Sequence, residues 1–391
     1  IGSQCSEPHY AACKTIGEEG IVLLKNEKNI LPIQPGRYRR ILVVGENADR
    51  SLTKGGGSSE LKTLRDISPL ESLRRLYGDK LDYAQGYTSG RAIYDEVDKV
   101  DPKENERLRE EALQKAKQAD LIIFIGGLNK NCKQDCENAD RESYDLSFGQ
   151  NELITALAKL QKNIVVCTFG GNAFATPWIG QVKGFVHCWY LGSMAGDALA
   201  DVLSGTCNPS GKLPVTFAKK LGDYSFAQYG AEAYPGVNKQ VYYKEGLFVG
   251  YRHFDTHKVT PQFPFGFGLS YTTFSYGRPR LSANSLKGDG KLTLSVDITN
   301  TGKREGKEIV QLYIGQQSPV EERPLKELKG FEKVSLKPGE TKTVDFTISK
   351  PMLQYFSAKS HDWTVDNDTF AAYVCASSED VRGKVSFSYQ Q

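Results

Sequence analysis

The sequence predicts an α/β domain followed by a β-sandwich. In the first half, continuous apolar runs alternate with amphipathic stretches, which is typical of a sheet covered by helices on both faces. After about residue 281, helical periodicity gives way to short alternating strands separated by turns. A length of 391 residues suits two or three domains, and two is our working count.

The first half contains one predicted amphipathic helix and four predicted buried strands. The helix spans residues 16–25, with Leu31-Pro32 after it as a stop signal. Each strand is a short apolar run that ends in glycine, at residues 41–45, 121–127, 163–171 and 184–192. Further helices are predicted between or after these strands, at residues 104–119, 149–161 and 195–205. Ligands of such open sheets bind beyond the carboxyl ends of the strands, so the loops after these glycines are where we expect chemistry.

The second half begins with a segment rich in Tyr, Phe, Gly and Pro, which is too aromatic for a flexible linker. We expect its rings to serve packing between domains rather than sugar stacking. Short strands then follow at residues 291–302, 308–316, 326–336, 341–348, 370–378 and 384–389. This pattern predicts an immunoglobulin-like or fibronectin type III-like sandwich. The predicted bounds are 1–222 for the α/β domain, 223–280 for the aromatic connector and 281–391 for the sandwich.

Composition excludes several classes of function. Fifty Lys and Arg against 47 Asp and Glu leave a net charge of +3 without a basic run, so nucleic acid is not an expected partner. No apolar stretch approaches the ~20 residues of a membrane span, and we expect no membrane insertion. The eight cysteines fit packed free thiols. Cys132 and Cys136 are the only close pair, too poorly spaced for zinc, and a disulfide between them remains open. No metal or cofactor is expected.

Four segments together resemble the family 3 glycoside hydrolases. They are GEEGIVLLKNEKNILP at residues 17–32, VVGENADRSLTKGGGSS at 43–59, the connector YKEGLFVGYRHFDT with FPFGFGLSYTTFSY, and VDITNTGKREGKEIVQLYIGQQSPVEERPLKELKGFEKVSLKPGET. The resemblance covers most of the chain and implies a C-terminal α/β-sandwich domain plus a fibronectin type III-like domain. It also implies a preceding barrel domain, absent from this sequence, which would carry the aspartate nucleophile.

The resemblance implies that the loop over residues 128–141 presents the acid/base carboxyl group of a retaining glycosidase. Glu137 matches that position best, and Asp135 is the second choice. An acid/base residue needs a pKa raised towards neutrality, which burial would provide. Without the resemblance, Glu137 would be read as an ordinary solvated carboxylate. The Asp140-Arg141 step is expected to anchor the base of the loop.

The glycine-rich loop at residues 54–59 lacks the spacing of a phosphate-binding or dinucleotide-binding motif. The resemblance implies that its backbone approaches the sugar site and that Ser58 offers a hydroxyl to the substrate. An ordinary flexible loop is the equal alternative.

The expected function is therefore that of the C-terminal portion of an exo-acting β-glucosidase that cleaves terminal, non-reducing β-D-glucosyl residues with retention. Its expected partners are a β-glucoside or oligosaccharide substrate and the barrel domain of the same enzyme, and a homodimer is left open. Alternatives are a β-xylosidase of the same family or a non-catalytic carbohydrate-binding or scaffold protein. The expected compartment is periplasmic or secreted, and the chain alone is expected to be inactive.

Overall fold

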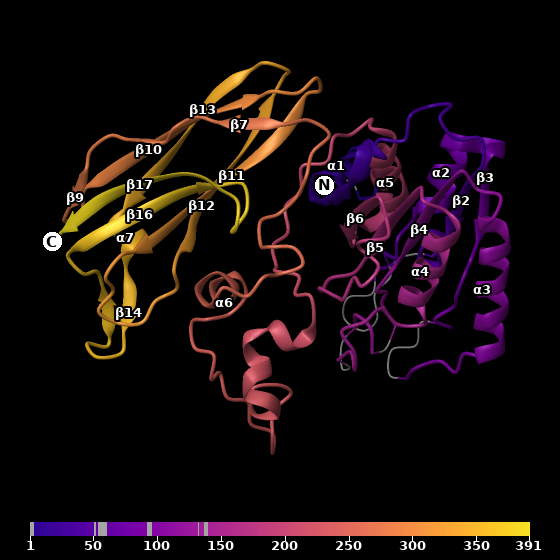
Figure 1. The fold of residues 1–391 in the computed structure, drawn as a ribbon, viewed down its shortest axis with the longest axis horizontal. Helices are drawn as coiled ribbons and strands as arrows, with labels where there is room; N and C mark the ends of the chain where they lie inside the picture. The colour runs from indigo at the N-terminus through magenta and orange to yellow at the C-terminus, as the bar shows by residue number, and fades with distance from the viewer. Residues whose placement is uncertain (1–3, 51, 54–60, 92–95, 132, 137–139) are drawn as a thin grey trace. The chain divides into compact units, whose positions relative to one another are not determined.

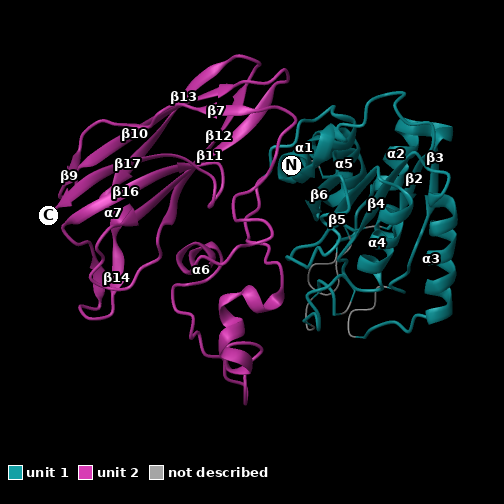
Figure 2. Ribbon diagram, viewed as in Figure 1, with its two compact units in different colours: residues 1–211 teal, residues 212–391 magenta. Residues whose placement is uncertain are grey.

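The structure is a computed structural model that describes residues 4–50, 52–53, 61–91, 96–131, 133–136 and 140–391. The chain divides into two compact units, residues 1–211 and residues 212–391 (Figure 2). The first unit is the predicted α/β domain, and the second contains the aromatic segment and the predicted sandwich. The domain bounds at residues 222 and 280 stay predictions.

A largely parallel sheet lies at the centre of the first unit (Figure 1). Its order, over the described residues, is β1-β6-β5-β4-β2-β3. The strands are β1 Val22–Asn26, β2 Ile41–Val44, β3 Leu81–Ala84, β4 Leu121–Gly127, β5 Ile164–Phe169 and β6 Gly184–Trp189. Strands β2 to β6 run parallel, and β1 pairs antiparallel with β6. Every residue of β2, β4 and β5 is buried, which confirms the prediction made from their apolar runs.

Helices pack on this sheet in two groups. They are α1 Glu7–Gly20, α2 Pro69–Tyr77, α3 Pro102–Ala116, α4 Gln150–Leu160 and α5 Ala195–Ser204. Helix α5 contacts α1 and α2, whereas α3 contacts α4. The crossover through α2 leads from β2 outward to β3, and those through α3 and α4 lead the opposite way. Right-handed crossovers in opposite directions place their helices on opposite faces.

The predicted helix over residues 16–25 is wrong in its second half. Helix α1 begins earlier, at Glu7, and ends at Gly20, and Val22–Asn26 form strand β1. The residues from Ile21 to Leu24 are β-branched or leucine and nearly inaccessible, and Val22 pairs with His187 of β6. Burial against a sheet edge suits such residues better than a helix does. Helix α2 and strand β3 were not predicted from the sequence.

The second unit ends in a sandwich of two sheets, as predicted (Figure 1). One sheet contains β7 Phe274–Tyr276, β8 Arg280–Leu281, β10 Lys291–Asn300 and β13 Thr341–Ser349. The other contains β9 Ser285–Lys287, β11 Gly306–Gln316, β12 Glu327–Leu336, β16 Asp368–Cys375 and β17 Val381–Gln390. A hairpin of β14 Tyr355–Ser357 and β15 Asp362–Thr364 follows the short helix α7 Lys350–Leu353. Alternate residues of β10 and β13 point into one apolar core with side chains of β11, β16 and β17.

The aromatic segment before the sandwich contains two 3-10 helices, Leu221–Asp223 and Ser225–Glu232, and helix α6 Tyr251–His257. Its rings pack on one another within the second unit: Phe263 contacts Phe217 and Phe267, and Tyr251 contacts Phe265 and Tyr313 of β11. Edge-to-face and offset ring contacts of this kind add to the energy of area burial. The aromatic rings therefore pack within the second unit, and the expected packing between domains stays a prediction.

Candidate functional site

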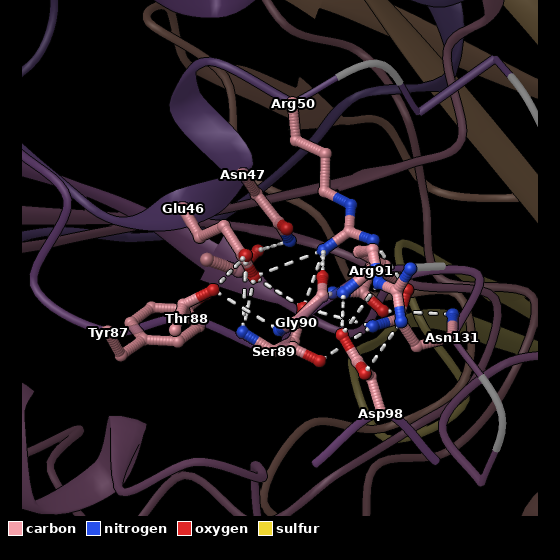
Figure 3. Close-up of polar contacts among 12 residues, drawn as sticks. Glu46, Asn47, Arg50, Tyr87, Thr88, Ser89, Gly90, Arg91, Asp98 and Asn131 are labelled. Atoms are coloured by element: carbon pink, nitrogen blue, oxygen red, sulfur yellow. Dashed lines mark hydrogen bonds and ion pairs between the residues drawn. The ribbon is translucent and has the colours of Figure 1, made fainter. Parts of the chain in front are cut away.

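Between the carboxyl ends of β2 and β4, the connections of the chain to the next strand change direction. From β2 the chain crosses to β3 on one side, and from β4 it continues to β5 and β6 on the other. Such a switch point is where ligands bind in open α/β sheets, because the loops that leave the two strands diverge there. In this unit, the loops after β2, β3 and β4 place a group of polar side chains at that point (Figure 3).

Glu46, directly after β2, is the centre of this polar group. Its carboxylate accepts hydrogen bonds from Thr88 Oγ1 at 3.0 Å, from the Ser89 backbone N–H at 3.0 and 3.1 Å, and from Ser89 Oγ at 2.5 Å. Arg50 lies one helical turn further on and forms an ion pair with Glu46 at 3.2 Å. Both charged side chains are largely buried, and such a charge is tolerated only when its partners are in place.

Arg50 and two asparagines tie the loop after β4 to the same centre. Arg50 Nη2 donates to Asn131 Oδ1 at 2.5 Å, and Asn131 Nδ2 donates to the Ser89 carbonyl oxygen at 3.0 Å. Asn129 Nδ2 donates to Ser89 Oγ at 3.1 Å. Figure 3 shows Arg50, Ser89 and Asn131 pointing toward one another from three loops. The network therefore fixes where the loop after β4 leaves the sheet.

Buried side-chain amides hold the backbone at the start of that loop. Asn47 Nδ2 donates to the carbonyl oxygens of Gly126 and Leu128, both at 3.0 Å. Gln150, at the start of α4, accepts from the Gly127 N–H at 2.8 Å and donates to its carbonyl oxygen at 2.9 Å. Backbone groups that the end of β4 would leave unpaired are thus satisfied by side chains, which is what burial at this edge requires.

Asp135 links the loop after β4 to the loop after β5. One carboxylate oxygen accepts from the Gly171 N–H at 2.5 Å, and the other accepts from Asn172 Nδ2 at 2.8 Å. The side chain is half-buried. Both oxygens are thus engaged by donors of the protein itself, so the geometry gives Asp135 the part of a connection between loops.

Arg141 attaches the far side of the same loop. Its Nη2 donates to the Ala173 carbonyl oxygen at 2.7 Å, again in the segment after β5. Asp140 beside it is exposed. This contact agrees with the predicted role of the Asp140-Arg141 step as an anchor of the loop's base. Asp135 and Arg141 therefore hold the loop on either side of residues 137–139.

Tyr190 follows β6 at the carboxyl end of that strand. The ammonium group of Lys130 lies 4.2 Å from the centre of its ring, a cation–π contact. Burial, and secondarily the Asp135 carboxylate, raise the pKa of the Tyr190 hydroxyl far above its usual value. Tyr190 is therefore a neutral phenol at physiological pH.

Two predicted site residues, Glu137 and Ser58, lie outside the described residues, as does Cys132. Their roles stay predictions. Among the residues that the structure does describe, no group of three His, Cys, Asp or Glu side chains is arranged to hold a metal ion. In the same residues, no helix is long and apolar enough to cross a membrane.

Sequence reasoning missed the whole polar centre of Glu46, Arg50, Ser89 and Asn131. The available signal was weak: Glu46 and Arg50 follow a buried strand directly, with the i, i+4 spacing that lets an ion pair form on one turn. Ser89 gave no signal, because it follows a strand that the sequence did not reveal.

Comparison with known proteins identifies both units. Residues 21–271 match the glycosyl hydrolase family 3 C-terminal domain, and residues 308–378 match a fibronectin type III-like domain. A β-glucosidase of Bacteroides ovatus is 50% identical over 100% of this chain and 53% of its own length. The crystal structure of a β-glucosidase from Bifidobacterium adolescentis matches with a TM-score of 0.87 and 33% identity, over 99% of this chain and 54% of that one.

Relatives with other names also match. They include a periplasmic β-glucosidase of Salmonella typhimurium, 35% identical over 90% of this chain and 46% of its own length, and a β-xylosidase of Formosa agariphila, 33% identical over 96% and 49%. The chain spans about half the length of the curated relatives it matches. With its α/β unit matched to the family's C-terminal domain, the chain belongs to glycoside hydrolase family 3.

Proposed function

We propose that this chain is the C-terminal portion of a retaining, exo-acting β-glucosidase and that it supplies the acid/base residue, Glu137, while a barrel domain supplies the aspartate nucleophile. The observation that carries the proposal is the attachment of the loop after β4 at the switch point. Asn131, Asp135 and Arg141 hold it at both ends. In the sequence, Glu137 falls between Asp135 and Arg141.

The proposed chemistry is a double displacement. The nucleophilic aspartate attacks the anomeric carbon while the bond to the leaving oxygen breaks, and Glu137 gives its proton to that oxygen. Water then attacks the anomeric carbon of the glycosyl-enzyme and loses a proton to Glu137, which frees the aspartate. This outcome requires the two carboxyl groups to lie about 5–5.5 Å apart.

Asp135 is the less suitable acid/base because its oxygens already accept hydrogen bonds from Gly171 and Asn172. Both contacts would have to break before Asp135 could approach a glycosidic oxygen. On the substrate side, the proposal keeps Ser58 as a hydroxyl that contacts a sugar hydroxyl.

Glucose is the proposed sugar because the Bacteroides ovatus relative, at 50% identity, is a β-glucosidase. Xylose is the second candidate, favoured by the Formosa agariphila relative. Comparison of kcat/KM for the nitrophenyl β-glucoside and β-xyloside by the longer, barrel-containing polypeptide separates them. A higher value for the xyloside would replace glucose by xylose in the proposal.

The acid/base assignment is tested by Glu137→Ala and Asp135→Ala in the barrel-containing polypeptide. Glu137→Ala should lower kcat by about 100-fold or more on an alkyl glucoside, since a poor leaving group needs the proton. It should cost much less on a dinitrophenyl glucoside, and added azide should restore turnover. Asp135→Ala should show neither the leaving-group dependence nor the azide rescue, because it acts on the loop. The reverse pattern would transfer the acid/base role to Asp135.

Residues 1–391 alone should hydrolyse no glycoside above the uncatalysed rate, because an acid without a nucleophile lacks the oriented attack that accelerates the reaction. Measurable, active-site-dependent turnover by this chain would contradict the division of roles. The proposed compartment is periplasmic or secreted, in line with the Salmonella typhimurium relative. Cell fractionation that finds the mature protein only in the cytosol would contradict it.

A further inference from the structure

The segment of residues 234–249 carries an exposed apolar surface within the second unit. Seven large apolar side chains are exposed there, from 42% for Val237 to 83% for Tyr243; the others are Tyr234, Val241, Tyr242, Leu247 and Val249. Figure 1 shows this part of the chain, before α6, extending away from the sheets of the sandwich. So many exposed apolar side chains along one short segment favour a surface that meets another protein surface.

The segment is not an unstructured linker, because its backbone closes on itself. Val237 and Gln240 exchange two backbone hydrogen bonds, of 2.9 and 3.0 Å. The Tyr242 N–H donates to the Glu232 carbonyl oxygen at 2.9 Å. Local hydrogen bonds therefore set the backbone path while the apolar side chains stay exposed, so the surface exists before any partner binds.

Ring contacts hold both ends of the segment in the second unit. The Tyr234 ring lies 5.6 Å from that of Phe226, and the Phe248 ring lies 5.0 Å from that of His257 in α6. These contacts define where the exposed surface is presented.

The segment itself carries few charges, and these are nearly balanced. Lys244 forms an ion pair with Glu232, and the other charged residues within 234–249 are Lys239 and Glu245. A neutral surface of this kind does not select a polyanion or any strongly charged partner. Apolar surfaces without net charge are typical of permanent interfaces.

We propose that the 234–249 segment docks on the barrel domain of the same polypeptide; this rests on the proposed function, which requires such a domain. The match to the β-glucosidase of Bifidobacterium adolescentis covers 99% of this chain but only 54% of that protein. A polypeptide of the relatives' length thus brings a large further domain along with this segment. A domain on the same chain is present at high effective concentration and occupies such a surface ahead of a second copy.

Limited proteolysis with chymotrypsin tests the proposal. The substrates are residues 1–391 alone and a fusion in which the preceding half of the Bacteroides ovatus relative leads into residue 1. Cleavage within residues 234–249 should be rapid in the chain alone and at least about tenfold slower in the fusion. The control is the β14–β15 hairpin, whose Phe356 and Trp363 are also exposed and in ring contact, and whose cleavage rate should not change.

Paired substitutions give the second arm. Tyr243→Asp with Leu247→Asp should restore cleavage and lower the Tm in the fusion, and should leave the Tm of residues 1–391 unchanged. Trp363→Asp is the matched control and should alter neither. Any of three outcomes would overturn the proposal. The segment is cleaved at equal rates in both proteins, the hairpin is protected as well, or the segment is protected in residues 1–391 alone by a concentration-dependent dimer. None of these readouts uses glycosidase activity, so an inactive fusion with a protected segment would count against the proposed function alone.

Discussion

Buried His187 should make the stability of the first unit depend on pH. The ring lies between Phe174 and Trp189, and its Nδ1 is 2.9 Å from Thr168 Oγ1. Burial lowers the pKa of His187 from 6.5 to about 3, because a charged imidazolium is poorly solvated there. The folded protein therefore keeps this imidazole neutral, whereas the unfolded chain binds a proton below pH 6.5.

The sign of the effect follows from this difference in proton binding. Between pH 6.5 and about 3 the unfolded state holds the extra proton, so the contribution of His187 to stability is complete above pH 6.5 and is lost as the pH falls. Each pH unit is worth about 1.4 kcal/mol. Acidification from pH 6.5 to 5 should therefore remove about 2 kcal/mol of the free energy of unfolding through this one group.

Urea unfolding followed by tryptophan fluorescence measures the effect, since buried Trp178 reports on the first unit. The free energy of unfolding is compared at pH 5 to 8 for the natural chain, for His187→Asn and for His361→Asn. His187→Asn should lower stability at pH 8 and flatten its pH dependence by about 2 kcal/mol over the acid range. Exposed His361 is the matched control and should leave the pH dependence unchanged. Parallel curves for the natural chain and His187→Asn would refute the reasoning.

Three further predictions concern the first unit. Gly45→Ala should prevent folding or lower the free energy of unfolding by more than about 3 kcal/mol, because φ is +129° and the added Cβ would lie 2.0 Å from the Ile125 carbonyl oxygen. Gly36→Ala, where the added Cβ meets open space, is the control and should cost about 1 kcal/mol. Equal losses for the two variants in urea unfolding would contradict this prediction. Ser68→Ala should cost about 1 kcal/mol in the same assay by removing the N-cap of α2, and no loss would show the cap to be dispensable. Trp178→Phe should cost about 2 kcal/mol or more by leaving a buried amide oxygen unpaired, and a neutral result in thermal unfolding would count against that.

The sequence revealed the central strands because their environment leaves a local record. Residues 41–44 and 121–127 are buried on both faces, so every position must be apolar or glycine. Edge strand β3, Leu81–Ala84, is only partly buried and only four residues long, and its mixed composition resembles a loop. The local signal therefore weakens towards the edge of the sheet.

Strand β1 shows a second limit. Ile21 to Leu24 are apolar, follow a helix directly and read as its continuation in sequence. Their conformation is decided by pairing with β6, more than 150 residues away. The local sequence pattern does not indicate a pairing with so distant a strand. Tertiary pairing therefore overrides local propensity here.

By itself, the sequence determined the order of domains, the buried strands of the α/β unit, the sandwich and, through four segments, the family resemblance. It also pointed to the loop after β4, although its choice of Glu137 and Ser58 rests on resemblance alone. Only the tertiary structure decided that Glu46 and Arg50 are buried at the switch point, and that Asp135 connects two loops. The physical reason is that apolar burial repeats along a strand and so is written locally. A polar residue looks the same in the sequence whether it is solvent-exposed or part of a buried network. Partners that are distant in the sequence decide which of the two it is.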